Sequence, residues 1–127
     1  MRTELVLSDE LFPVQSFFNA LDDTRLERAL IAFASGHGFN PEDRTCDFPA
    51  DLAEDEGGPA ERFNYIEFWT YVGNEETRIS FDQFLKILDE VVAAQIKADQ
   101  QNAAKWEKSL SAVHDAVRSI AKRTVLF

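Results

Sequence analysis

The sequence predicts an α+β fold with N-terminal helices, a small antiparallel sheet built on a hairpin over residues 63–80, and long C-terminal helices packed on it. Two observations carry this prediction. Apolar residues recur at helical spacing near both ends of the chain. Between these regions, residues 63–72 form a run of aromatic and β-branched residues that is typical of a strand.

Two helices are predicted before residue 39. Leu11, Val14 and Phe17 begin an apolar stripe that continues to Leu21, with a proline in the first turn, where proline is tolerated. A second helix is expected to start at a capping box formed by Thr24 and Glu27. The Gly36-His-Gly38 sequence is predicted to end it.

The hairpin is expected to consist of a strand over 63–72 with both faces at least partly covered, a turn over 73–76, and a short returning strand over 77–80. Phe63, Tyr65, Glu67, Trp69 and Tyr71 would share one face, and Ile66, Phe68 and Val72 the other. The aromatic residues of the first face are by default core or sheet-packing residues, and Trp69 or Tyr71 would be an interface anchor if an edge of that face is exposed.

The C-terminal part is predicted to hold one or two long helices. Ser80 and Gln83 form a capping box at the start of the first, and its apolar stripe runs to residue 96. A polar bridge over 97–105 leads to a second stripe over 106–120. The apolar Thr124-Val-Leu-Phe127 end is expected to return as a strand or to dock on the core.

Composition indicates one domain over residues 1–127, since 45% of the residues are hydrophobic and the length suits a single core. The formal net charge of −10 disfavours binding to nucleic acid or to anionic membranes. A single cysteine, Cys46, allows no internal disulfide, and neither a signal peptide nor a bilayer-length apolar stretch is visible. We therefore expect a cytoplasmic protein of unknown oligomeric state.

Residues 39–61 are the most informative segment. Three prolines and the Gly57-Gly58 pair favour an irregular loop, and seven carboxylates surround the single Arg44 between residues 41 and 59. Unpaired charges resist burial, so the loop is expected either to be a docking surface for a positively charged partner or to be a solvated, partly mobile charged loop.

Enzymatic and metal sites are not predicted. His37 lies in a helix-ending turn, His114 lies within a helix, and Cys46 has acidic neighbours that disfavour a reactive thiolate, so we expect a buried or half-buried structural cysteine. The carboxylates do not follow the spacing of an EF-hand loop. We expect no catalytic residue, no cofactor and no metal. A small hydrolase using paired carboxylates ranks last because no spaced catalytic motif supports it.

Three segments in order resemble a known family. They are Gly38-Phe-Asn-Pro-Glu-Asp-Arg-Thr-Cys-Asp-Phe-Pro-Ala-Asp-Leu52, the strand around Ile66-Glu-Phe-Trp69, and Ile79-Ser-Phe-Asp-Gln-Phe-Leu-Lys-Ile-Leu88. Together they resemble contact-dependent growth inhibition immunity proteins of the CdiI type, which neutralise ribonuclease toxins. The resemblance covers about residues 30–96, and this chain adds Ala53–Ala60 and the tail from Ala98.

The resemblance implies a stoichiometric inhibitor whose partner is the basic C-terminal ribonuclease domain of a cognate toxin. Charge and side-chain chemistry then select the contact residues. Arg44, Cys46 and Phe48 are expected to be structural. Arg44 would tie the loop together through Asp43 or Asp47, and Phe48 would pin it to the core. The predicted toxin contacts are Asp43, Asp47, Asp51, Glu54, Asp55 and Glu56, with Glu61, Glu67, Glu75 and Glu76 as secondary candidates. The alternative is an acidic adaptor that binds a basic protein unrelated to any toxin.

Overall fold

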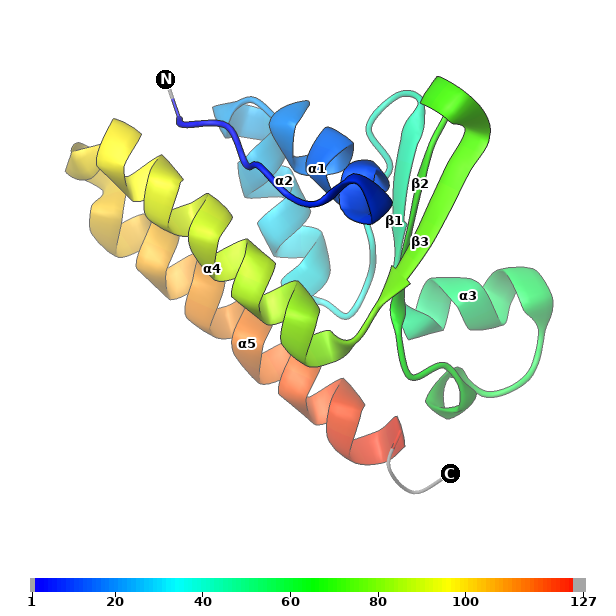
Figure 1. Cartoon of the computed structure of the whole chain (residues 1–127). Coiled ribbons are helices and arrows are strands. Elements are labelled where there is room, and N and C mark those ends of the chain that lie inside the picture. The colour runs from blue at the N-terminus through cyan, green and yellow to red at the C-terminus, as the bar shows by residue number, and fades with distance from the viewer. Residues whose placement is uncertain (1, 125–127) are drawn as a thin grey trace.

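A computed structural model describes residues 2–124 of the chain and confirms the α+β fold, with five α-helices and a three-stranded antiparallel sheet in that part (Figure 1). In chain order the elements are the 3₁₀ turn η1 (Asp9–Leu11), α1 (Phe12–Asn19), α2 (Asp23–Ala34), β1 (Arg44–Asp47), α3 (Pro49–Glu56), η2 (Ala60–Arg62), β2 (Ile66–Thr70), η3 (Val72–Asn74), β3 (Glu75–Ile79), α4 (Phe81–Ala98), η4 (Gln100–Asn102) and α5 (Ala103–Thr124). The apolar residues 125–127 lie outside the described part. None of the described helices is long and apolar enough to cross a membrane.

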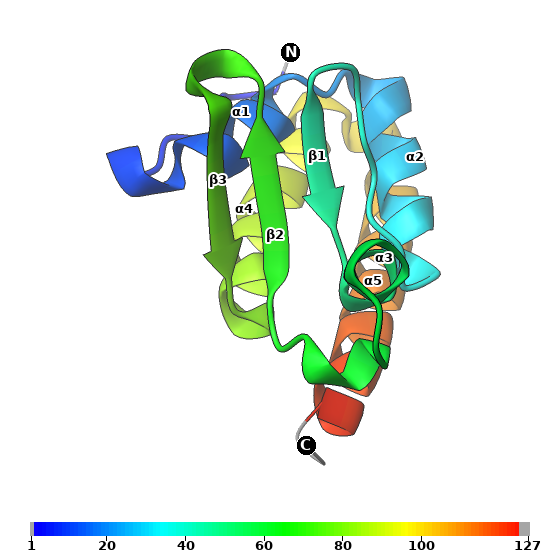
Figure 2. The same ribbon diagram turned by 90° about the vertical axis from the view of Figure 1, so that its right-hand side faces the viewer.

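The sheet has strand order β1-β2-β3 and separates two unlike environments. One face packs against α1 and the beginning of α4, while no helix covers the middle of the other face (Figure 2). The short helix α3 projects from the end of β1 on the uncovered side, away from the other helices (Figures 1 and 2). Only α3 and η2 border that face at its lower end.

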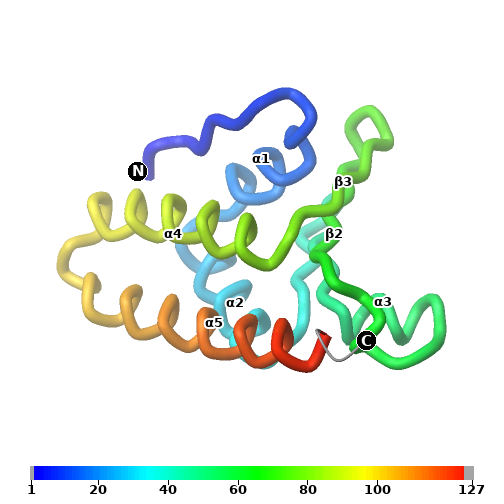
Figure 3. The backbone as a smooth tube through the Cα atoms, turned by 60° about the horizontal axis from the view of Figure 1, so that its bottom comes forward, coloured from blue at the N-terminus to red at the C-terminus, as the bar shows by residue number. Residues whose placement is uncertain are grey.

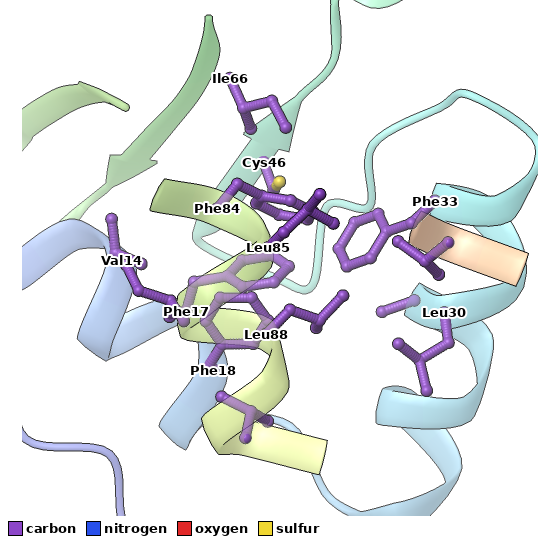
Figure 4. Close-up of a cluster of buried hydrophobic side chains, with 14 of the residues drawn as sticks. Val14, Phe17, Phe18, Leu30, Phe33, Cys46, Ile66, Phe84, Leu85 and Leu88 are labelled. Atoms are coloured by element: carbon purple, nitrogen blue, oxygen red, sulfur yellow. The ribbon is translucent and has the colours of Figure 1, made fainter. Parts of the chain in front are cut away.

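The core is dominated by phenylalanines from both the helices and the sheet (Figure 4). The Phe68 ring of β2 lies 5.3 Å from Phe17 of α1 and 6.3 Å from Phe84 of α4, measured between centroids. Phe33 of α2 lies 5.3 Å from Phe84 in an edge-to-face arrangement. Such offset and edge contacts add to the area that each ring buries, so they join the sheet to three helices.

α4 and α5 form an antiparallel pair, and α2 packs on α5 (Figure 3). The predicted polar bridge is short: α4 ends at Ala98 and α5 begins at Ala103. Trp106 is 2% exposed, and its indole Nε1 donates to Asp99 Oδ2 at 3.0 Å, which satisfies the polar atom of a buried ring.

One of the two helices with a predicted capping box begins at the predicted residue. The Ser80 hydroxyl accepts from the backbone N–H of Gln83 at 3.1 Å, as expected. The prediction for α2 was wrong by two residues, because the N-cap is Asp22, whose carboxylate accepts from the N–H of Arg25 at 2.8 Å. A carboxylate is at least as good a cap as threonine, so the helix begins earlier.

The prediction of an irregular loop over 39–61 was wrong. That segment contains β1 and α3, because Pro49 occupies the first turn of α3, where a missing N–H costs nothing. Gly57, at φ 84°, ends the helix in a conformation that glycine adopts freely. The prolines and glycines therefore delimit structure within this segment.

The hairpin strand is shorter than predicted. β2 covers residues 66–70 only, and Val72 is 56% exposed in the turn η3, so the expected placement of Val72 beside Ile66 and Phe68 on the covered face was wrong. The chain leaves the strand geometry already at Tyr71, which has helical dihedral angles (φ −62°, ψ −36°), so Val72 lies in the turn. Both strand faces are at least partly covered, as expected: Ile66 and Phe68 are buried on one face, and Glu67 and Trp69 are half-buried on the other, although no helix lies over its middle (Figure 2).

Candidate functional site

Asp51 fixes the start of α3. One of its carboxylate oxygens accepts from the backbone N–H groups of Phe48 at 2.8 Å and Gly38 at 2.7 Å. The other lies 3.2 Å from Nδ1 of His37. A carboxylate at a helix N-terminus stabilises the helix dipole and the free N–H groups, so this predicted contact residue already has a structural role.

Gly38 lies against β1 without space for a side chain. A Cβ atom there would lie 1.7 Å from the carbonyl oxygen of Cys46. Phe39 and Cys46 exchange backbone hydrogen bonds of 3.0 and 3.1 Å beside this contact. The Gly-Phe pair that opens the resemblance motif therefore serves as a partner for the edge of β1.

Cys46, Phe48 and Arg44 are structural, but Arg44 acts differently from the prediction. Cys46 is fully buried, which raises the pKa of its thiol well above the usual value and keeps it unreactive. Phe48 is also fully buried and stacks on Phe33 with ring centroids 5.2 Å apart, which confirms that it pins this segment to the core. Arg44 donates from Nε to the Ser16 hydroxyl of α1 at 2.8 Å, whereas no ion pair with Asp43 or Asp47 forms among residues 2–124.

The uncovered side of the sheet, here called the outer face, carries two rows of side chains. The strand register sets Thr45, Trp69 and Glu76 in one row. It sets Asp47, Glu67 and Arg78 in the next. Successive residues of a strand point to opposite faces, so these six alternate with the buried residues of the same strands.

Asp47 and Glu67 are direct cross-strand neighbours of like charge. Partial burial, together with the charges of Asp51, Asp55 and Glu67, raises the pKa of Asp47 from 3.8 to about 6. Partial burial also raises the pKa of Glu67, although Arg78 opposes this by donating from Nε to Glu67 Oε1 at 3.3 Å. Like charges directly opposite each other destabilise a sheet, so the fold itself gains nothing from Asp47 being ionised.

The end of α3 adds further carboxylates beside these rows. Glu54, Asp55 and Glu56 are exposed. Asp55 is close enough to raise the pKa of Asp47, and Glu56 is close enough to act on Glu67. We call the resulting surface the acidic corner, and its residues are Asp47, Asp55, Glu56, Glu67 and Glu76.

The other predicted contact residues lie elsewhere. Asp43 is exposed in the turn before β1, where its carbonyl accepts from the N–H of Tyr71 at 2.9 Å. Glu75 begins β3 opposite Thr70, in the row adjoining the hairpin turn, and is exposed. Glu61 lies in η2, half-buried, at a cavity of about 170 Å³ bordered by the end of α5.

Arg78 has a role in the site that the sequence does not indicate. Its guanidinium lies 4.5 Å from the centroid of the Tyr65 ring and is hydrogen-bonded to Glu67, so it holds a cation over an aromatic ring beside a carboxylate. Only the strand register places Arg78 opposite Glu67, and a single sequence does not reveal that register.

The outer face of the sheet is negatively charged and partly aromatic. In the described part of the chain no group of three or more His, Cys, Asp or Glu side chains is arranged to hold a metal ion. His114 of α5 is hydrogen-bonded to Asp89 of α4 at 2.7 Å. This contact joins the two packed helices and does not involve the acidic corner. A negatively charged, partly aromatic face suits contact with a basic macromolecular surface.

The comparison with protein families gives one match. The family model described as CDI immunity protein matches residues 10–110, from η1 into α5. The match therefore extends beyond the region of the sequence resemblance at both ends. No curated protein and no solved structure matches the chain significantly.

Proposed function

The chain belongs to the CDI immunity protein family, and from this premise we propose that it neutralises a cognate ribonuclease toxin by covering the toxin's cationic cleft with the acidic corner. Family membership itself gives an immunity role and a cognate toxin as partner. The ribonuclease activity of the toxin and the acidic contact surface are the proposed parts.

The observation that carries the proposal is the unfavourable pairing of Asp47 with Glu67. The fold places two carboxylates opposite each other on an uncovered sheet face and adds Asp55 and Glu56 from α3. A partner that brings positive charge would relieve this repulsion. The electrostatic free energy that the repulsion costs the folded protein would then contribute to binding.

A ribonuclease presents cationic side chains to the phosphates of its substrate. Carboxylates can occupy the positions of phosphates, so a surface of this charge is suited to the same cleft. Opposite charges also accelerate association, which matters when a toxin enters a living cell. Inhibition is then stoichiometric, with one immunity protein for each toxin and no turnover.

Co-expression with the toxin domain encoded by the adjacent upstream gene tests the proposal. We expect a complex that co-purifies, restored growth, and intact cellular RNA where the toxin alone degrades it. Degraded RNA despite a stable complex would contradict neutralisation. Toxicity without any RNA cleavage would show that the toxin has a different activity.

The contribution of the acidic corner is separable from the immunity role. The combined variant Glu54→Lys, Asp55→Lys and Glu56→Lys reverses three exposed charges on α3. As a control, Glu107→Lys reverses an exposed charge near the beginning of α5, which is the end of that helix far from α3 (Figure 1). We expect only the α3 variant to lose protection. Equal protection by both variants would remove α3 from the contact surface.

A further inference from the structure

We propose that Trp69 is the anchor of the toxin interface and that it stacks against an arginine of the toxin, whose charge Glu67 and Glu76 neutralise. The proposal rests on the proposed function, because it takes a basic toxin domain as the partner. It adds the centre of the interface and the chemistry of the group that is bound.

Trp69 is held in place before any partner arrives. Its indole Nε1 donates to Asn74 Oδ1 at 2.9 Å. Asn74 itself has φ 50°, a left-handed conformation that asparagine tolerates better than most residues, at the end of the η3 turn. The turn thus orients the ring, so binding costs little side-chain entropy.

The outer face already binds one guanidinium in this way. Arg78 lies 4.5 Å from the centre of the Tyr65 ring while it donates to Glu67 at 3.3 Å. Trp69 lies in the row next to that of Glu67 and Arg78. Glu76 is directly opposite it on β3, and Thr45 is opposite it on β1. Tryptophan is the best ring for a cation, and a carboxylate beside the ring fits a guanidinium better than an ammonium.

The surroundings of Trp69 support a protein contact. Tyr71 is 68% exposed and Val72 is 56% exposed in the adjoining turn, and both are large apolar side chains facing water. Interface centres are rich in aromatic anchors with polar residues around them. The carboxylates of the outer face and α3 outnumber its one arginine, so the complementary partner is basic.

The two tryptophans of the chain allow a direct test with an internal control. The protein is labelled with 5-fluorotryptophan, and the unlabelled toxin domain is added while fluorine NMR is recorded. We expect the Trp69 signal to shift and to lose its sensitivity to H₂O/D₂O exchange, while the signal of buried Trp106 stays unchanged. The Trp69→Phe variant assigns the two signals.

A complex in which the Trp69 signal does not respond would overturn this inference and leave the proposed function intact. The absence of any complex with wild-type protein would overturn both. These two outcomes are distinguishable because complex formation is read independently by co-elution.

Truncation variants measure the size of the effect. We expect Trp69→Ala to weaken toxin binding about 30-fold or more, as anchor residues do. Ile31→Ala, a control that truncates another exposed apolar side chain on α2, should change the dissociation constant less than about threefold. Equal affinities of the two variants would contradict the assignment, and circular dichroism melts verify that both are folded.

Discussion

The two faces of the sheet use alternate residues of the same strands for opposite purposes. On the inner face Cys46 and Phe68 are paired and fully buried against helices. On the outer face the next pair, Asp47 and Glu67, sets two carboxylates against each other. The inner pair stabilises the folded chain and the carboxylate pair opposes it, and this contrast supports the proposal that the outer face binds a partner.

Helix α3 repeats this division along its length. Its beginning is fixed to the body of the protein, because Phe48 at the N-cap is buried and Asp51 in the first turn accepts from the backbone N–H groups of Phe48 and Gly38. Its last turn carries Glu54, Asp55 and Glu56 into water. The first turn therefore fixes the position of the helix, and the last turn determines the charge that it displays.

Removing an inner-face anchor should have the largest effect. Phe48→Ala deletes a fully buried ring that contacts Phe33 and Phe84, and we expect it to lower the free energy of unfolding by about 3–5 kcal/mol. Urea denaturation followed by circular dichroism measures this loss. A change below about 1 kcal/mol would show that the segment does not depend on Phe48.

Reversing charge at the end of α3 should change binding without changing stability. With lysine at positions 54, 55 and 56, we expect toxin association to slow about 10- to 100-fold at low salt. The difference from wild type should shrink as salt is added, because exposed charges are screened. Stopped-flow mixing measures the rates, and a salt-independent difference would point to a loss of shape complementarity in place of electrostatics.

Asp51→Ala should behave as an inner-face change although it removes the same charge. It leaves the N–H groups of Gly38 and Phe48 without their acceptor, and we expect a loss of about 1–2 kcal/mol of stability. Asp55→Ala is the matched control, with an expected change within about 0.5 kcal/mol. If both variants unfold at the same urea concentration, Asp51 does not hold the helix.

Asp47→Asn should give the smallest effect, and in the opposite direction. Because the pKa of Asp47 is about 6 in the fold and 3.8 in the unfolded chain, the folded state binds more protons between these values. Wild-type stability therefore falls as pH rises from 4 to 6, and the variant should lack this contribution.

At pH 7, after allowance for solvent screening of this half-exposed group, we expect Asp47→Asn to gain about 1 kcal/mol. Urea midpoints measured from pH 4 to 8 test both the gain and its pH dependence. A loss of stability at pH 7 would contradict the strain assigned to the outer face.

Helical periodicity and capping chemistry predicted most of the fold, because these signals are local. The stripe that begins at Ser80 identified α4, and the aromatic run identified β2. The prolines and glycines of 39–61 predict a loop, whereas in the structure Pro49 and Gly57 mark the two ends of α3. Proline and glycine delimit a helix when they lie at its ends and interrupt it when they lie inside, and the sequence alone did not show which position they occupy.

From the sequence, the candidate site could be predicted only as a region of negative charge. Composition identified an acidic segment, but the joining of Asp47 to Glu67 depends on strand register, and the neighbourhood of Asp55 depends on how α3 leaves β1. The sequence does not distinguish Asp51 from the neighbouring carboxylates, because an aspartate that accepts from backbone N–H groups at the start of a helix and a free surface aspartate are the same residue type.

Competition with RNA tests most directly whether the acidic corner covers the toxin's cleft. A catalytically inactive variant of the toxin domain is bound to fluorescently labelled RNA, and the immunity protein is titrated in while fluorescence anisotropy is recorded. We expect full release of the RNA at one immunity protein per toxin, with weaker release by the lysine variant of α3. A ternary complex in which RNA stays bound, formed by an immunity protein that still blocks the active toxin, would contradict it.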